Sequence, residues 1–180
     1  MTRPPFPPPT EAEVDAVSRQ LGRPARGVIG IAARCACGAP TVVATLPRLP
    51  DGTPFPTLYY LSHPAATAAM STLEAIGVMP EWAATLEGEV AEAYTAAHEQ
   101  YLADRESVAH VPEIDGVSAG GMPTRVKCLH ALAAHALATG PGVNPIGDRA
   151  IAESAWSPER CECAEPFDPS QASWLPGTAA

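Results

Sequence analysis

The 180-residue chain has few aromatic side chains, few basic ones and no long apolar run. Aromatic residues make up 6% of the sequence, and much of the 46% that is hydrophobic is alanine, so we expect a modest helical core. The net charge of −9 argues against nucleic acid and anionic membranes as partners, because both select for basic surfaces. No apolar run approaches the ~20 residues that cross a bilayer.

The first residues, MTRPPFPPPTEAE, also lack the apolar segment of a secretory signal peptide. We therefore expect a cytoplasmic protein. In that reducing compartment, five cysteines are better explained as free thiols or metal ligands than as disulfides. Their odd number and their pairing as C-x-C agree with that explanation.

The order of local patterns predicts a single α+β domain over residues 10–153. Residues 1–9 are proline-rich and are expected to form a disordered leader, and residues 154–180 are expected to form a disordered acidic and proline-rich tail. The predicted fold is a small antiparallel sheet of about three strands packed against four or five helices. Helical patterns cover residues 10–22, 64–77, 80–109 and 123–139, and strand patterns cover 27–33, 41–46 and 55–62.

Six cysteine and histidine side chains are candidate zinc ligands: Cys35, Cys37, His63, Cys128, His130 and His135. Zinc prefers four nitrogen or sulfur ligands in a tetrahedron. Cys35 and Cys37 lie in the turn of a predicted hairpin, where Gly38 permits the tight backbone that a C-x-C chelate needs. His63 follows the third predicted strand, and a short meander can bring it to the same edge of the sheet.

The predicted helix over residues 123–139 is expected to supply one ligand only. Cys128 and His135 are seven residues apart, which is about 10.5 Å along a helix axis, and Cys128 and His130 point to opposite sides of a helix. We therefore predict a zinc site formed by Cys35, Cys37, His63 and Cys128.

Two alternatives to this ligand set stay open. Cys35 and Cys128 can simply be buried thiols, since cysteine is among the most commonly buried residues. A site built from two C-x-C pairs, Cys35/Cys37 and Cys161/Cys163, has suitable spacing, but its second pair lies in the predicted tail, where the sequence offers no reason to fold.

The start of the same predicted helix has the composition of an anion site. Free N–H groups, the positive end of the helix dipole and two cations favour a phosphate or carboxylate there. The candidate residues are Gly120, Gly121, Thr124, Arg125, Lys127 and Asn144. The alternative is an ordinary Gly–Gly turn followed by a solvated helix end.

Residues of this region can also be combined into a candidate catalytic site. His130 or His135 can act as a general base, with Asp148 brought back by the loop GPGVNPIGD, and Cys128 can act as a nucleophile. Glu74 can reach the site, although completing its own helix is the simpler role. Histidines on a helix face are more often packed or hydrogen-bonded than catalytic.

Three stretches resemble the bacterial family called domain of unknown function 501: RCACGAPTVVATLPRLPDGTPFPTLYYLSHP, LEAIGVM and GGMPTRVKCLHALAAHALATGPGVNPIGD. Together they span roughly residues 14–150. The resemblance implies a bacterial cytoplasmic protein to which no activity is assigned. Family members often carry a cysteine where this chain has His63, and either residue type can bind zinc.

Two functions follow as hypotheses. The favoured one is a zinc-binding module that binds a protein partner or a small anion. The alternative is a small hydrolase for a phosphate-containing substrate, with the anion held at the start of the 123–139 helix.

Overall fold

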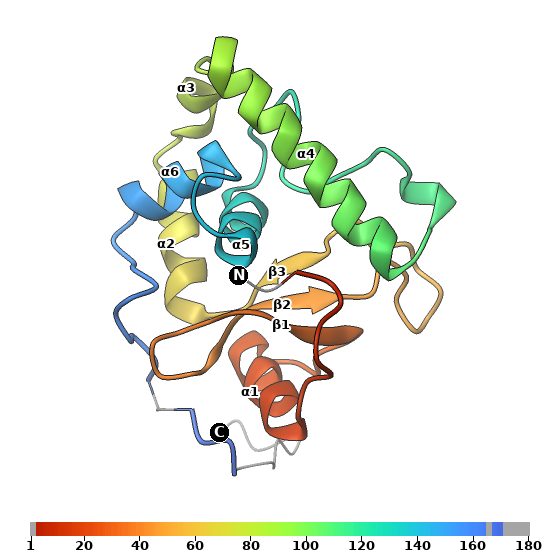
Figure 1. Cartoon of the computed structure of the whole chain (residues 1–180). Helices are drawn as coiled ribbons and strands as arrows, with labels where there is room; N and C mark the ends of the chain where they lie inside the picture. The colour runs from red at the N-terminus through yellow and green to blue at the C-terminus, as the bar shows by residue number, and fades with distance from the viewer. Residues whose placement is uncertain (1–2, 165–166, 171–180) are drawn as a thin grey trace.

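The computed structural model describes residues 3–164 and 167–170, which form one sheet with helices on both of its faces (Figure 1). Within these residues the elements are α1 Glu11–Leu21, β1 Val28–Arg34, β2 Pro40–Thr45, β3 Tyr59–Leu61, α2 Pro64–Ala75, α3 Met79–Ala83, α4 Gly88–Val108, the 3-10 turn η1 Pro112–Ile114, α5 Leu129–Thr139 and α6 Pro145–Glu153. The α+β class and the three strands confirm the predicted fold, and α6 is a helix that the sequence analysis did not predict.

The three strands lie in the order β1-β2-β3, and both neighbouring pairs are antiparallel. β2 is central, and all six of its residues are buried. Val43 faces α1 and packs with Val17, while Val42 faces the opposite side and packs with Tyr59. The alternation of side chains along β2 therefore gives the sheet two buried faces.

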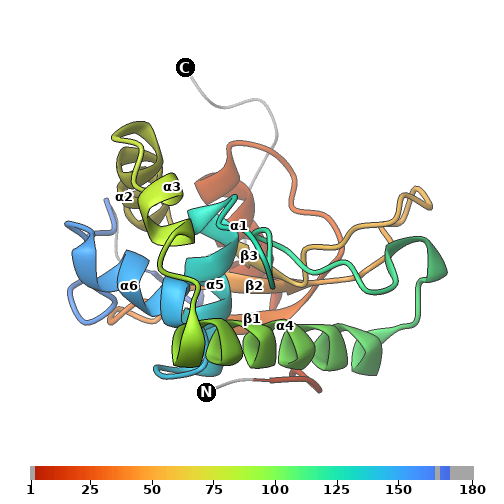
Figure 2. The ribbon, with the colours of Figure 1, turned by 90° about the horizontal axis from the view of Figure 1, so that it is seen from above.

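α5 is the helix at the centre of the larger core. Eight of its eleven residues are buried, as expected for a helix that is apolar on all sides. It contacts β3, α2 and α6, and Figure 2 shows it between α6 and the strands. No helix in the described part of the chain is both long and apolar enough to cross a membrane.

The N-terminal segment, predicted to be disordered, packs on the domain over residues 3–9. The Arg3 guanidinium donates to the Asp104 carboxylate at 3.0 Å, and the Phe6 ring meets the Tyr59 ring edge to face. Gly30 makes this crossing possible, because a Cβ there would lie 2.3 Å from the Cβ of Phe6. Residues 1–2 of the predicted leader lie outside the described residues.

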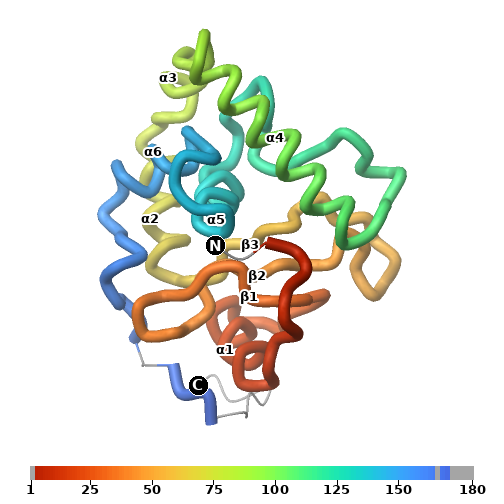
Figure 3. Tube along the Cα trace, in the orientation of Figure 1, coloured from red at the N-terminus to blue at the C-terminus, as the bar shows by residue number. Residues whose placement is uncertain are grey.

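Residues 154–164, which belong to the predicted disordered tail, run from α6 past the β1–β2 hairpin (Figure 3). Trp156 is buried to 3% exposure, and its ring lies 5.8 Å from the ring of His63. Burial of one large aromatic side chain favours packing of this segment, although its overall composition favours disorder. Residues 165–166 and 171–180 of the predicted tail lie outside the described residues.

Candidate metal centre

The turn between β1 and β2 presents two cysteines on a tight backbone. The N–H of Cys35 donates to the carbonyl of Ala39, and the N–H of Gly38 donates to the carbonyl of Cys35, both at 2.8 Å. Gly38 adopts a φ of 89°, which favours glycine. Gly38 therefore permits the tight turn that was predicted beside the C-x-C pair.

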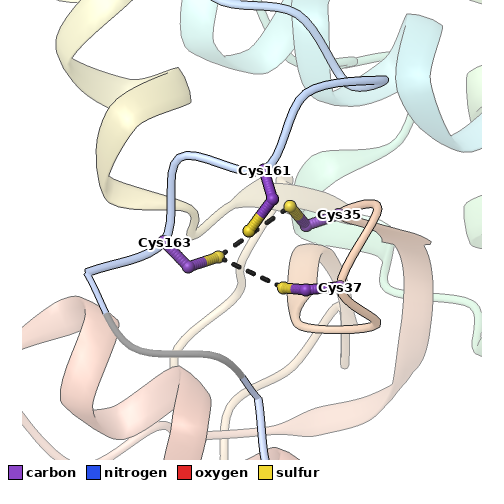
Figure 4. A group of neighbouring side chains, drawn as sticks. All are labelled: Cys35, Cys37, Cys161 and Cys163. Atoms are coloured by element: carbon purple, nitrogen blue, oxygen red, sulfur yellow. Dashed lines mark hydrogen bonds between the residues drawn. The ribbon is translucent and has the colours of Figure 1, made fainter.

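Four cysteine sulfurs meet at this turn. Cys35 and Cys37 come from the hairpin and Cys161 and Cys163 from the C-terminal segment, and Figure 4 shows their sulfurs pointing toward one another. All four Sγ atoms lie within 4.8 Å of one another, with Cys37–Cys163 at 3.5 Å and Cys35–Cys163 at 3.8 Å. All four are free thiols. Four thiolates at ~2.3 Å from one tetrahedral zinc are about 3.8 Å apart, so this four-cysteine cluster has the dimensions of a zinc site.

His63 lies against the four-cysteine cluster as a hydrogen-bond donor. It is the N-cap of α2, where its Nδ1 accepts from the N–H of Ala66 at 3.4 Å. The proton is therefore on Nε2, which lies 3.2 Å from the Sγ of Cys163. Donors of this kind orient and stabilise metal-bound thiolates from outside the ligand set.

The predicted ligand set of Cys35, Cys37, His63 and Cys128 is thus not brought together. Cys161 and Cys163 complete the cluster in place of His63 and Cys128, so the alternative set with two C-x-C pairs is the one that the fold assembles. The signal was visible in the repeated C-x-C spacing, but composition alone predicted that the second pair lies in a disordered tail.

The two thiols of the hairpin, Cys35 and Cys37, have pKa values shifted in opposite directions. Burial is the largest effect on Cys37 and raises its pKa, but hydrogen bonds from the backbone N–H of Ala39 and from other donors outweigh it and lower the pKa to about 6. Burial raises the pKa of Cys35. Cys37 is therefore the thiol in this pair that most readily provides a thiolate at neutral pH.

Cys128 belongs to a second group, which we call the Glu74–Cys128–His130 cluster. α5 begins at Leu129 and not near residue 123, so Cys128 is its N-cap. For that reason Cys128 and His130 do not point apart as predicted for two helical residues, and the Cys128 Sγ lies 4.0 Å from the His130 Nδ1. That Nδ1 is also 3.1 Å from the Glu74 Oε1, which accepts from the N–H of Leu129 at 2.7 Å.

Cys128 and His130 each favour the ionised form of the other. The hydrogen bond with Cys128, followed by the charge of Glu74, raises the pKa of His130 to about 9 despite its partial burial. The hydrogen bond with His130 lowers the pKa of Cys128.

The later helix start also changes the predicted anion site. Thr124, Arg125 and Lys127 are exposed in a turn region before α5. The N–H groups of Arg125 and Lys127 donate to the carbonyls of Gly121 and Gly120, which closes these turns and takes up donors that the prediction had assigned to an anion. The α5 start instead holds the carboxylate of Glu74. Binding of an external anion by these residues stays a prediction.

The predicted catalytic residues have separate sets of partners. His130 contacts Glu74, whereas His135 is fully buried and lies 3.1 Å from the Nδ2 of Asn144. Asp148 accepts from the N–H of Gly142 and lines a hollow of about 710 Å³ between β1, α5 and α6. A catalytic role for any of them stays a prediction.

Asn144 has a structural role that explains the unpredicted helix. It is the N-cap of α6 and accepts from the N–H of Gly147 at 2.9 Å, and Pro145 occupies the first helical position. An Asn–Pro pair at this place is a helix-start signal, although the Gly- and Pro-rich composition of this stretch predicts a loop. Asn144 is fully buried.

Acid is expected to destabilise the protein through His135. Its ring is stacked on Tyr59 and edge-on to Tyr101, and burial lowers its pKa to about 4. The amide of Asn144 donates to Nδ1, so the native ring is neutral. Since the unfolded histidine protonates near pH 6.5, stability falls as the pH drops from about 6.5 toward 4, at up to ~1.4 kcal/mol per pH unit.

Urea unfolding at pH 7 and pH 5 measures this loss. A His135→Gln variant is expected to lose part of the pH dependence, whereas His110→Gln, at an exposed histidine, is expected to keep it. Any effect of pH on bound metal is common to both variants and cancels in the comparison. Equal pH dependence in the two variants would contradict the prediction.

Comparison with protein-family models identifies a family over most of the chain. A family described as "Protein of unknown function (DUF501)" matches residues 31–152. No curated protein and no solved structure matches the chain. The match covers the hairpin cysteines and the Glu74–Cys128–His130 cluster, and it ends before Cys161 and Cys163.

Proposed function

Since the chain belongs to the DUF501 family, whose description assigns no activity, we propose from geometry that the four-cysteine cluster binds one structural zinc ion. The observation that carries the proposal is the meeting of four sulfurs within 4.8 Å, brought by segments about 126 residues apart in the sequence. Four thiolates in a tetrahedron suit zinc, and they leave no open position for a substrate.

The zinc ion would fasten the C-terminal segment to the β1–β2 hairpin. His63 supports this role, because its Nε2–H faces the sulfur of Cys163, and Trp156 packs beside the His63 ring. The protein would then act as a zinc-stabilised module through its surface. A protein partner or small anion as its target remains a prediction, and hydrolysis of a phosphate-containing substrate remains the alternative.

Elemental mass spectrometry on full-length, tag-free protein purified without chelator tests the zinc proposal. Cys161→Ser/Cys163→Ser is expected to contain one zinc per chain fewer than the natural protein, since two of four ligands are gone. Both residues lie outside helices and strands, so circular dichroism should show an unchanged fold.

Glu162→Gln is the matched control, because Glu162 lies between the two cysteines without contributing a sulfur. It is expected to keep the full zinc content. A double cysteine variant with as much zinc as the control would overturn the proposal.

A further inference from the structure

The Glu74–Cys128–His130 cluster has the composition and geometry of a second metal site. Glu74 lies in the last turn of α2, Cys128 caps α5 and His130 lies in the first turn of α5. One oxygen, one sulfur and one ring nitrogen of the three lie within 4.8 Å of one another. The side chains of Glu74 and His130 are each 26% exposed, so solvent reaches the cluster.

The surroundings of His130 determine which of its two ring nitrogens can bind a metal in place of a proton. Its Nε2 lies 3.1 Å from the carbonyl oxygen of Thr67, which can only accept, so Nε2 carries a proton. Nδ1 is then the nitrogen that faces the sulfur of Cys128 and the carboxylate of Glu74. Metal-binding histidines usually donate their second N–H to a backbone carbonyl or carboxylate in this way.

The carboxylate of Glu74 is oriented as well. Its Oε1 accepts from the N–H of Leu129 at 2.7 Å and lies 3.1 Å from the Nδ1 of His130. Donor atoms at 2.0–2.3 Å from a tetrahedral zinc are about 3.3–3.8 Å apart. The observed separations of 3.1 Å for oxygen to nitrogen and 4.0 Å for sulfur to nitrogen bracket that range.

We propose that Glu74, Cys128 and His130 bind a second divalent cation of the zinc class, with a fourth position open to water or to an oxygen of a substrate. Three protein ligands of mixed type with one open position are typical of catalytic zinc sites, whereas four cysteines are typical of structural ones. The two sites use no residue in common, so this proposal stands or falls independently of the zinc ion in the four-cysteine cluster.

Zinc counts on full-length variants separate the two sites. The natural protein is expected to hold two zinc ions per chain, Cys128→Ser one, and Cys161→Ser/Cys163→Ser one. If the natural protein holds one ion that only the Cys128 variant loses, the second site stands and the four-cysteine proposal fails. If Cys128→Ser loses no zinc, the second site is overturned.

Alkylation of Cys128 by iodoacetamide, followed by peptide mass spectrometry, gives a readout that does not depend on the zinc count. A metal-bound sulfur is a poor nucleophile, so zinc is expected to slow alkylation of Cys128 at least about tenfold. In Glu74→Gln, whose side chain can still accept from Leu129, this protection is expected to be lost.

Ser71→Ala is the matched control, because the Ser71 hydroxyl contacts only the Nε2 side of His130. Protection by zinc is expected to persist in this variant. Equal alkylation of Cys128 in the natural protein with and without zinc would show a reactive thiol without a metal, and the proposal would be wrong.

Discussion

Removal of zinc from the four-cysteine cluster is expected to release residues 154–164 from the domain and to lower the free energy of unfolding by several kcal/mol. An ion that binds only the native state adds about 4 kcal/mol when its concentration is a thousandfold above its dissociation constant. In the native state this ion would join Cys37 to Cys163, which are 126 residues apart in the sequence.

Hydrogen exchange and urea unfolding, each with and without a chelator, measure the two effects. Exchange is expected to rise in the peptide that carries Trp156 and the two tail cysteines. A smaller rise is expected in α5. The core around that helix contains none of the four cysteines, although it includes Trp156 from the released segment. The loss of stability should appear as a lower urea midpoint.

Cys161→Ser/Cys163→Ser supplies the control for this experiment. Without two ligands, the variant is expected to show the raised exchange in residues 154–164 before any chelator is added. Chelator is expected to cause no further rise in that segment. If the natural protein loses its zinc and its exchange pattern stays the same, the metal does not hold the C-terminal segment in place.

The sheet could be predicted because its signal is local. Alternation along β3 places Tyr59 and Tyr60 on opposite faces of the sheet, and the structure buries Tyr59 completely while Tyr60 is partly exposed. The C-x-C pair beside Gly38 likewise depends on a single turn. Such features need only a few neighbouring residues, which a sequence pattern reports directly.

The second half of the four-cysteine cluster could not be predicted, because it depends on contacts between distant segments. Composition favours disorder around Cys161 and Cys163, and it does not reveal that Trp156 packs beside His63. The capping role of Glu74 depends on such contacts too, since the sequence indicated only that Glu74 can reach the site or complete its own helix. Its carboxylate caps α5 from another helix, and Cys128 lies just before that helix start, next to His130.

Gly147→Ala is expected to destabilise the protein by about 3 kcal/mol, although alanine normally stabilises a helix by up to ~1 kcal/mol relative to glycine. Gly147 lies in the first turn of α6, and a Cβ there would lie 2.2 Å from the carbonyl oxygen of Leu132 and 2.8 Å from the Cβ of Ala136. Both atoms belong to the buried helix α5, so relief requires the two helices to separate. Urea unfolding gives the sign of the change directly.

Gly142→Ala separates this contact from backbone strain. Gly142 adopts a φ of 88° with nothing within 4 Å of an added Cβ, so alanine there costs only the strain of that conformation, about 1–2 kcal/mol. Gly147 has no positive φ, so the loss of stability expected for Gly147→Ala comes from the close approach of α6 to α5. If Gly147→Ala is as stable as the natural protein or more stable, the higher helix propensity of alanine outweighs the clash. The two helices then do not pack at this distance, and the prediction is wrong.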